Sequence, residues 1–202
     1  MQHKNFLMPR IGLFWLAWAV FGIALISAVG IISAGARAAE PAPAKIDLSQ
    51  YTGKWYQLYN QEEHGRFESD KGKQVQFGDK GTCYGTTVEY ALTAKGNVSV
   101  LNTCHKNNPQ GKTASIKGIA FPVDETNSKL KVRFNPLYLR PFLFDYWILW
   151  VDPHYQLALI GNKSTFSILS REKTAPESLL KTAFEKATEL GYDKSKVQKV
   201  SF

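Results

Sequence analysis

The stretch YTGKWYQLYN, residues 51–60, decides the fold of this chain. Its residues have strand character, yet it contains Gly53, and a glycine inside a strand normally weakens that strand. If Trp55 points to the buried face, the two-residue repeat of a strand places Gln57 and Tyr59 on that face as well. The stretch therefore predicts a first strand whose glycine has a local purpose.

Alternation of apolar and polar residues continues along the chain and dominates over helical periodicity. Further runs of this kind lie at residues 84–93, 97–105, 113–123, 129–135, 144–151, 156–161 and 165–171. Turn-forming groups such as AKGN, NNPQGK, DETNSK and GNKS separate them. Eight strands joined hairpin after hairpin predict an all-β fold, an antiparallel up-and-down barrel. Closure removes exposed edges, and a barrel of this size can hold one small ligand.

One amphipathic helix follows the strands, in TAPESLLKTAFEKATELG, residues 174–191. Thr174 is a plausible N-cap, Pro176 and Glu177 suit the first turn, and Gly191 supplies the stop. The apolar face consists of Leu179, Leu180, Ala183, Phe184, Ala187 and Leu190. This C-terminal helix is expected to pack outside the barrel, and VQKVSF at residues 197–202 predicts a last short strand.

The N-terminus is expected to carry an export signal. Lys4 and Arg10 precede an uncharged apolar run from residue 13 to about 35, and small residues flank Arg37 at a typical cleavage site. The run is also long enough to span a bilayer, so residues 1–38 are either a cleaved signal peptide or a membrane anchor. Residues 39–47 form a linker, and residues 48–202 form the exported domain. The domain is expected in the periplasm or secreted, or tethered to the inner membrane if the segment is retained.

The composition and charge of the chain bear on whether it binds nucleic acid. The chain has 202 residues, 44% of them hydrophobic, and a formal net charge of +8. The lysines are scattered among acidic residues, with no arginine-rich run and no basic helix face, which argues against a nucleic-acid partner. A solvated surface, with some attraction to anionic membranes, accounts for this charge.

Three segments carry a family resemblance: GKW at 53–55, VDPHY at 151–155 and LSR at 169–171. In order and spacing they resemble the conserved segments of lipocalins. The stretches VEYAL, GNVSVLN and KGIAFPVDETNSKLKVRF look like the branch that contains bacterial lipocalin and apolipoprotein D. The likeness covers about residues 46–200 and implies an eight-stranded barrel, closed at one end, that binds a small hydrophobic molecule.

The resemblance also implies structural roles for the motif residues. Gly53 gives the backbone room at the closed end, Trp55 plugs that end, and Arg171 stacks on the indole. Asp152 and Tyr155 are placed at the same end. Two features depart from the pattern. SDKGKQVQFGDKG, residues 69–81, lengthens the first loop at the open end, and the lipid-attachment cysteine of many bacterial relatives is absent.

Strand alternation, aligned with the barrel pattern, predicts the side chains that face the interior. Most are aliphatic or aromatic and a few carry polar groups, as a site for one apolar ligand requires. The candidates are Gln57, Tyr59, Val88, Tyr90, Val100, Asn102, Ile116, Ala120, Val132, Phe134, Tyr146, Ile148, Trp150, Ala158, Ile160 and Leu169. The alternative is that these side chains simply fill a small barrel.

The open-end loop NPLYLRPFLFDYW, residues 135–147, is unusually apolar. Leu137 to Phe144 surround one cation, Arg140, which suggests contact with a membrane. Alternatively, the loop folds over and caps the barrel mouth.

Cys83 and Cys104 are the only cysteines, and in an oxidising compartment they suggest a disulfide. A hairpin turn at residues 94–97 would place Cys104 opposite Thr87, roughly 13 Å from Cys83 at ~3.3 Å per residue, beyond the ~7 Å that a bridge allows. A bulge at Gly85 would close this gap. Bridged and free thiols are both open.

Catalysis has little support. The histidines share no metal-ligand spacing, and neither a phosphate-binding glycine loop nor a serine nucleophile elbow is present. No metal, cofactor or enzymatic activity is therefore predicted. The expected function is binding or transport of a fatty acid, lysophospholipid or similar lipid in envelope maintenance. The alternatives are an enzyme for an apolar substrate, using Tyr90 or Tyr146, and an anchored barrel that binds a protein partner.

Overall fold

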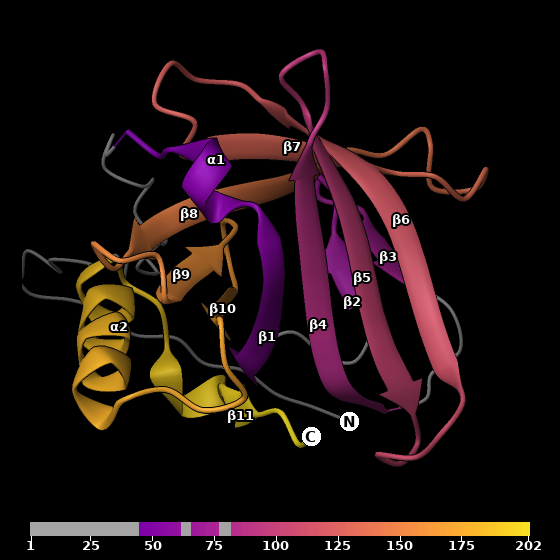
Figure 1. Ribbon diagram of the computed structural model, residues 1–202. Coiled ribbons are helices and arrows are strands. Elements are labelled where there is room, and N and C mark those ends of the chain that lie inside the picture. Colours follow the sequence, from indigo (N-terminus) through magenta and orange to yellow (C-terminus); the bar gives the residue numbers. More distant parts are fainter. Residues whose placement is uncertain (1–44, 62–65, 77–81) are drawn as a thin grey trace, which may run out of the picture. The chain divides into compact units, whose positions relative to one another are not determined.

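The computed structural model describes residues 45–61, 66–76 and 82–202 (Figure 1). Contacts divide the chain into residues 1–34 and 35–202, and the described residues belong to the second unit. The predicted export segment, 1–38, lies outside the described residues. Among the helices that are described, none has the length and hydrophobicity needed to cross a membrane.

Most of the described strands form one sheet that closes on itself. Its order is β10-β9-β8-β7-β6-β5-β4-β1-β11, and an additional pairing of β10 with β1 completes the barrel. β11 pairs only with β1, so the other eight strands make the wall, as the sequence predicted. Their bounds are β1 Gly53–Asn60, β4 Cys83–Leu92, β5 Val98–Lys106, β6 Thr113–Pro122, β7 Lys129–Phe134, β8 Phe144–Val151, β9 Leu157–Gly161 and β10 Phe166–Ser170.

The two ends of the barrel differ. At the closed end lie the short helix α1, Leu48–Tyr51, and the turns that follow β4, β6 and β8. The Ile46 amide donates to Thr126 O at 2.7 Å and joins the incoming chain to the β6–β7 turn. Asp47 caps α1 by accepting from the Ser49 amide, and hydrogen bonds from Ser49 and Gln50 lower the pKa of Asp47 to about 2. The loops after β1, β5, β7 and β9 surround the open end.

The C-terminal helix α2, Glu177–Glu189, packs outside the barrel (Figure 1). Its predicted apolar face joins Leu58, Leu157, Leu159, Phe166 and Ile168 from the outer wall. The predicted cap is wrong: Pro176 occupies the N-cap position without a side-chain bond, and the Thr174 carbonyl accepts from Ser170 Oγ instead. The chain ends in η1, Lys194–Lys196, and β11, Gln198–Lys199, which is the predicted short strand.

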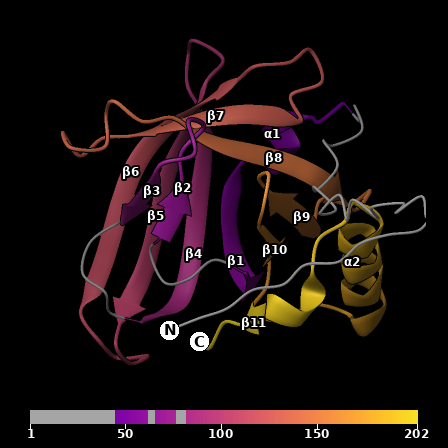
Figure 2. The same ribbon diagram turned by 180° about the vertical axis from the view of Figure 1, so that it is seen from behind.

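The long first loop contains a hairpin that the strand pattern did not predict. Strands β2, Arg66–Glu68, and β3, Gln74–Gln76, pair only with each other. In Figure 1 the hairpin lies behind β4 and β5, and in Figure 2, which is seen from behind, it lies in front of them. The inserted residues 69–81 therefore supply the turn and the second strand of a separate element.

Cys83 and Cys104 form a disulfide, with their Cα atoms 5.4 Å apart. The predicted register was wrong by one residue, because Thr87 faces Thr103. The pairing then shifts between Tyr84 and Thr87, where Gly85 has φ +58°. This irregularity shortens the separation along β4, so the bulge proposed at Gly85 accounts for the bridge.

Candidate functional site: the barrel cavity

Arg171 and Trp55 seal the closed end. The guanidinium carbon lies 3.8 Å from the centre of the Trp55 ring, and the indole N–H donates to Tyr51 O at 2.8 Å. Arg171 donates to three backbone carbonyls: Tyr155 at 3.1 Å, Lys54 at 3.1 Å and Gln50 at 2.7 Å. One side chain thus ties α1, β1 and the β8–β9 turn together, so the cation serves closure and does not enter the cavity.

The β8–β9 turn is organised by a buried carboxylate. Asp152 is 2% exposed and accepts from the amides of His154 at 3.0 Å, Gln156 at 2.6 Å and Leu157 at 2.6 Å. Tyr155 adopts φ +53°, and its hydroxyl accepts from the Asp47 amide at 3.0 Å. Both residues lie at the closed end with structural contacts, where the resemblance placed them.

The barrel encloses a cavity of about 1090 Å³, at the upper end of the range for small-molecule sites, about 300–1,000 Å³. Most of the residues predicted to face inward line it. These are Gln57, Val88, Tyr90, Val100, Asn102, Ile116, Ala120, Val132, Phe134, Tyr146, Ile148, Ile160 and Leu169. Ala158 also points inward, into the interior cluster with Trp55, but lies below the cavity. The barrel is therefore hollow above a packed base.

Tyr59 and Trp150 were predicted to point inward, and both predictions are wrong. Each lies in the outer cluster beside α2, and Tyr59 packs against Phe184 with ring centres 5.0 Å apart. The cause is a register shift in each strand, between Gln57 and Tyr59 in β1 and between Ile148 and Trp150 in β8. One extra residue reverses the facing of every later side chain.

Three tyrosines form the cavity floor. Tyr146 Oη lies 2.7 Å from Tyr51 Oη and 2.7 Å from Tyr90 Oη, and all three residues line the cavity. Burial raises the pKa of each phenol above its ordinary value. A general acid or base works best with a pKa near the operating pH, so these phenols are poor candidates for enzymatic proton transfer.

Tyr51 and Leu48 line the floor and were missing from the predicted set. Both belong to α1, which precedes the first strand. Strand alternation cannot assign residues outside strands. The signal that could have found Tyr51 is its place just before the GKW motif, where its carbonyl accepts the indole N–H of Trp55.

Charged residues that line the cavity gather at the mouth. They are Glu68 in β2, Lys106 at the end of β5, Lys112 before β6, Asp145 near the start of β8 and Lys199 in β11. The interior below them is lined by apolar and neutral polar groups. A ligand with a charged head and an apolar body matches this gradient from mouth to floor.

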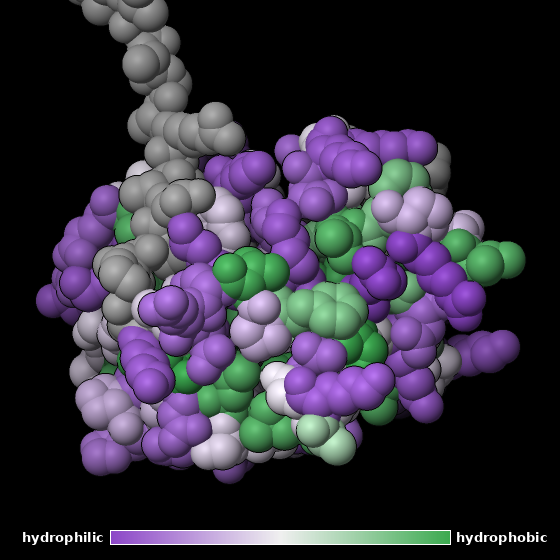
Figure 3. Space-filling view, turned by 90° about the horizontal axis from the view of Figure 1, so that it is seen from above, coloured by the Kyte–Doolittle hydropathy of each residue, from purple (hydrophilic) through white to green (hydrophobic). Residues whose placement is uncertain are grey.

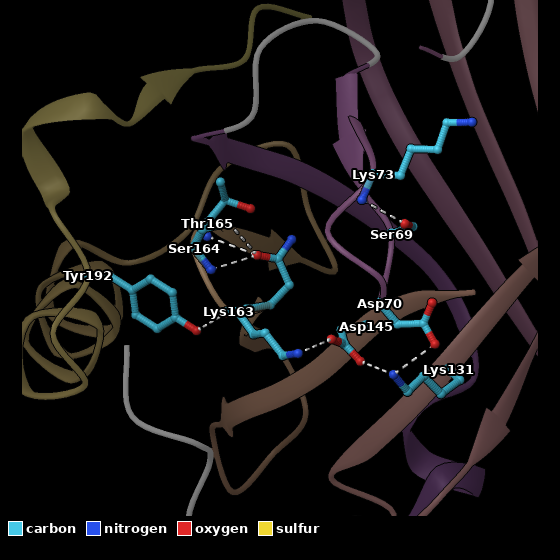
Figure 4. A network of polar contacts seen from close by, with 10 residues as sticks. Ser69, Asp70, Lys73, Lys131, Asp145, Lys163, Ser164, Thr165 and Tyr192 are labelled. Atoms are coloured by element: carbon cyan, nitrogen blue, oxygen red, sulfur yellow. Dashed lines mark hydrogen bonds and ion pairs between the residues drawn. The ribbon is translucent and has the colours of Figure 1, made fainter. Parts of the chain in front are cut away.

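An ion network ties the β2–β3 hairpin to the rim (Figure 4). Lys131 Nζ lies 2.6 Å from Asp145 and 3.4 Å from Asp70 at the hairpin turn, and Lys163 lies 3.8 Å from Asp145. Burial alone would lower the pKa of Lys131, but the two carboxylates outweigh it and raise that pKa. The Asp70 amide also donates to Leu143 O at 2.8 Å, so both backbone and charge hold the hairpin against the β7–β8 loop.

The apolar β7–β8 loop is divided between interior and surface. Leu139 is fully buried and Phe144 is 4% exposed, both within the interior cluster, and Phe142 packs against that cluster. Leu137 and Tyr138 are 77% and 59% exposed. One part of the loop therefore caps the barrel, while its tip presents two large side chains to solvent.

Apolar exposure at the opposite end is scattered. In the view of Figure 3, hydrophobic side chains form separate patches among hydrophilic ones. Leu92 and Val123, at the ends of β4 and β6, are 45% and 56% exposed.

Histidines and acidic residues do not assemble a metal site in the described part of the chain. No group of three His, Cys, Asp or Glu residues there has metal-binding geometry. His105, near the end of β5, pairs its Nδ1 with Gly111 O at 3.2 Å, while His154 lies in the β8–β9 turn at the other end. The two cannot act together.

Comparisons with known proteins agree with this geometry. The family model for a lipocalin-like domain matches residues 46–201. Temperature-induced lipocalin-1 of Arabidopsis thaliana is 36% identical over 164 residues, 76% of this chain and 78% of that protein. Lobster apocrustacyanin A1 superposes with a TM-score of 0.56 at 16% identity, over 81% of this chain and 89% of that one. The cockroach allergen Per a 4 gives 0.51 at 14%, over 80% and 91%. These two structural likenesses concern the fold alone.

Proposed function

This chain belongs to the lipocalin family, and we propose that its barrel binds or transports a fatty acid, a lysophospholipid or a similar lipid. Lipocalins generally bind small hydrophobic ligands. The observation that carries the proposal is the cavity of about 1090 Å³, which is lined by apolar and neutral polar groups inside and by charged groups at its mouth. Burial of an apolar chain provides affinity at ~25 cal/mol per Å² of surface removed from water, and the lysines at the mouth suit an anionic head.

Displacement of N-phenyl-1-naphthylamine, which fluoresces in apolar sites, tests this proposal. A matched pair of variants locates the site: Ile116 lines the cavity, whereas its neighbour Lys117 is exposed on the outer face of β6. Ile116→Trp is expected to weaken probe and oleate binding at least tenfold, and Lys117→Trp to leave both unchanged. Equal affinities in the two variants would place the probe outside the barrel and remove the proposal's support.

We further propose that the protein is exported and that it belongs to the lipocalin branch that contains bacterial lipocalin and apolipoprotein D. The disulfide supports export, because such bonds persist in oxidising compartments. We place the domain in the periplasm or outside the cell, serving lipid maintenance of the envelope, with residues 1–38 as cleaved signal or retained anchor. Mass spectrometry of the N-terminus of the purified protein distinguishes these two fates.

The exposed tip of the β7–β8 loop is proposed to touch the membrane from which the lipid comes. Leu137 and Tyr138 are the most exposed large hydrophobic residues described, with the cation Arg140 beside them. Leu137→Ser/Tyr138→Ser is expected to reduce co-sedimentation with vesicles containing phosphatidylglycerol. Leu92→Ser, at the closed end, is the control. Unchanged sedimentation of the double variant would contradict the contact.

A further inference from the structure

The hydroxyl groups at the cavity floor leave one hydrogen without an acceptor. Tyr146 Oη lies between Tyr51 Oη and Tyr90 Oη, at 2.7 Å from each. Three hydroxyls carry three hydrogens, and two hydrogen bonds use only two of them, whichever oxygen donates in each pair. Among the described residues, these three oxygens make no other hydrogen bond. One donor is therefore available at the floor in every arrangement of the hydrogens.

This donor lies in an aromatic setting with little exposure to solvent. Tyr51 and Tyr90 are 3% and 6% exposed, with ring centres 5.4 Å apart, and Tyr51 packs against Trp55 at 5.1 Å. A hydrogen bond from this donor to an acceptor on a ligand is stronger in such a setting than the same bond in water. The floor is thus polar at one point within an apolar surface.

The floor is also electrically neutral. Burial raises the pKa of all three phenols, which keeps them protonated. The guanidinium of Arg171 acts on Tyr51 and offsets part of the rise in the pKa of Tyr51, but its N–H groups donate to backbone carbonyls and Arg171 does not line the cavity. An ionised carboxylate at the floor would be desolvated without a cation in direct contact, which is unfavourable.

We propose that the Tyr51–Tyr146–Tyr90 chain binds an uncharged oxygen acceptor, a ketone or ester carbonyl or an alcohol, at the buried end of the ligand. A charged head group then stays at the mouth beside the lysines. The inference rests on the proposed function, because it assigns the chemistry and orientation of a ligand in the same cavity.

Probes of equal chain length test the assignment: decane, 2-decanone, 1-decanol and decanoate, each displacing N-phenyl-1-naphthylamine. The variant Tyr51→Phe/Tyr90→Phe/Tyr146→Phe keeps the rings and removes all three hydroxyls. It is expected to lower the affinity for 2-decanone and 1-decanol about three- to tenfold, the range of one neutral hydrogen bond. Decane and decanoate should bind as before. Tyr59→Phe, a hydroxyl deletion outside the barrel, should change none of the four affinities.

The outcomes separate this inference from the function on which it rests. If the probes bind the unmodified protein but the triple variant weakens decane as much as 2-decanone, or decanoate most of all, the inference is overturned and the binding function stands. If neither the fluorophore nor any chain binds the unmodified protein, both are overturned.

Infrared spectroscopy gives a second measurement that needs no variant. The carbonyl stretch of bound, isotope-labelled 2-decanone is expected below its frequency in liquid hydrocarbon, because a phenol donates to it. A frequency equal to that in hydrocarbon would overturn the inference, even if the triple variant fails to fold.

Discussion

Arg171 lies over Trp55 with 3.8 Å between the guanidinium carbon and the ring centre, and donates to the carbonyls of Gln50, Lys54 and Tyr155. Arg171→Ala removes this stacking and leaves three carbonyls without their donor. The free energy of unfolding is expected to fall by about 2–4 kcal/mol. Arg171→Lys keeps the charge but cannot reach all three carbonyls, so an intermediate loss is expected. Urea denaturation of the three proteins measures both losses, and an unchanged midpoint for Arg171→Ala would contradict this role.

Gly53 is expected to resist substitution for two reasons. Its φ is +94°, which disfavours a side chain, and an added Cβ would lie 3.2 Å from Arg171 Nη1. Gly96 is the control, because its φ is +77° but a Cβ there meets nothing within 4 Å. Gly53→Ala should destabilise by about 1–3 kcal/mol, and Gly96→Ala by less. Equal thermal shifts for both variants would mean that the contact with Arg171 adds nothing.

Alkaline pH is expected to destabilise the protein through its buried tyrosines. Burial raises the folded-state pKa of Tyr51, Tyr90, Tyr146 and Tyr192 above the ordinary value of 10.0. Above pH 10.0 the unfolded chain releases these protons while the folded chain keeps them, so stability falls by about 1.4 kcal/mol per pH unit for each such tyrosine. Below pH 10.0 the folded and unfolded chains both keep these protons, so the tyrosines cause no loss of stability there.

Absorbance of tyrosinate, followed together with circular dichroism, measures this effect. These phenols should ionise only as the fold is lost. In the triple phenylalanine variant the fall in stability with pH should be shallower, because only Tyr192 of the four remains. An equally steep fall in that variant would assign the pH dependence to other groups.

The ion network at the rim is expected to slow ligand exchange. Lys131→Ala removes the cation between Asp70 and Asp145, so the β2–β3 hairpin loses its ionic link to the rim. Its contacts with the β7–β8 loop remain: the hydrogen bond from the Asp70 amide and the stacking of Lys73 over Phe142. A partly exposed ion pair contributes about 0.2–1 kcal/mol, which predicts probe dissociation up to about fivefold faster. Stopped-flow displacement measures this rate. The control is Lys181→Ala, which breaks an exposed pair with Glu185 on α2. Equal rates for both variants would show that the hairpin does not limit exchange.

The sequence was sufficient for the barrel because alternation persists over eight strands, and the closed-end motif fixed their direction. It failed at Tyr59 and Trp150, because whether a strand takes an extra residue depends on packing that becomes visible only in three dimensions. At Cys83 the sequence did indicate an irregularity. Gly85 allowed a bulge to be proposed there, and the disulfide with Cys104 is present.

Two parts of the site were beyond strand patterns. The β2–β3 hairpin has three residues in each strand, too few for alternation to be recognised. The tyrosine floor joins residues from α1, β4 and β8. Strand alternation assigns a residue to one face of the sheet, but it does not show which hydroxyl groups from distant elements come into contact.

The seam that closes the barrel joins β1 to β10, where Tyr56 faces Ser170. The disulfide, by contrast, joins residues only 21 positions apart and constrains a local hairpin. Contacts between distant residues form slowly, because a long loop must lose its freedom before the contact stabilises anything. We therefore expect the pairing of β1 with β10, the first and last strands of the barrel wall, to limit the folding rate of this domain. Until these two strands pair, the barrel is open and does not enclose the ligand cavity.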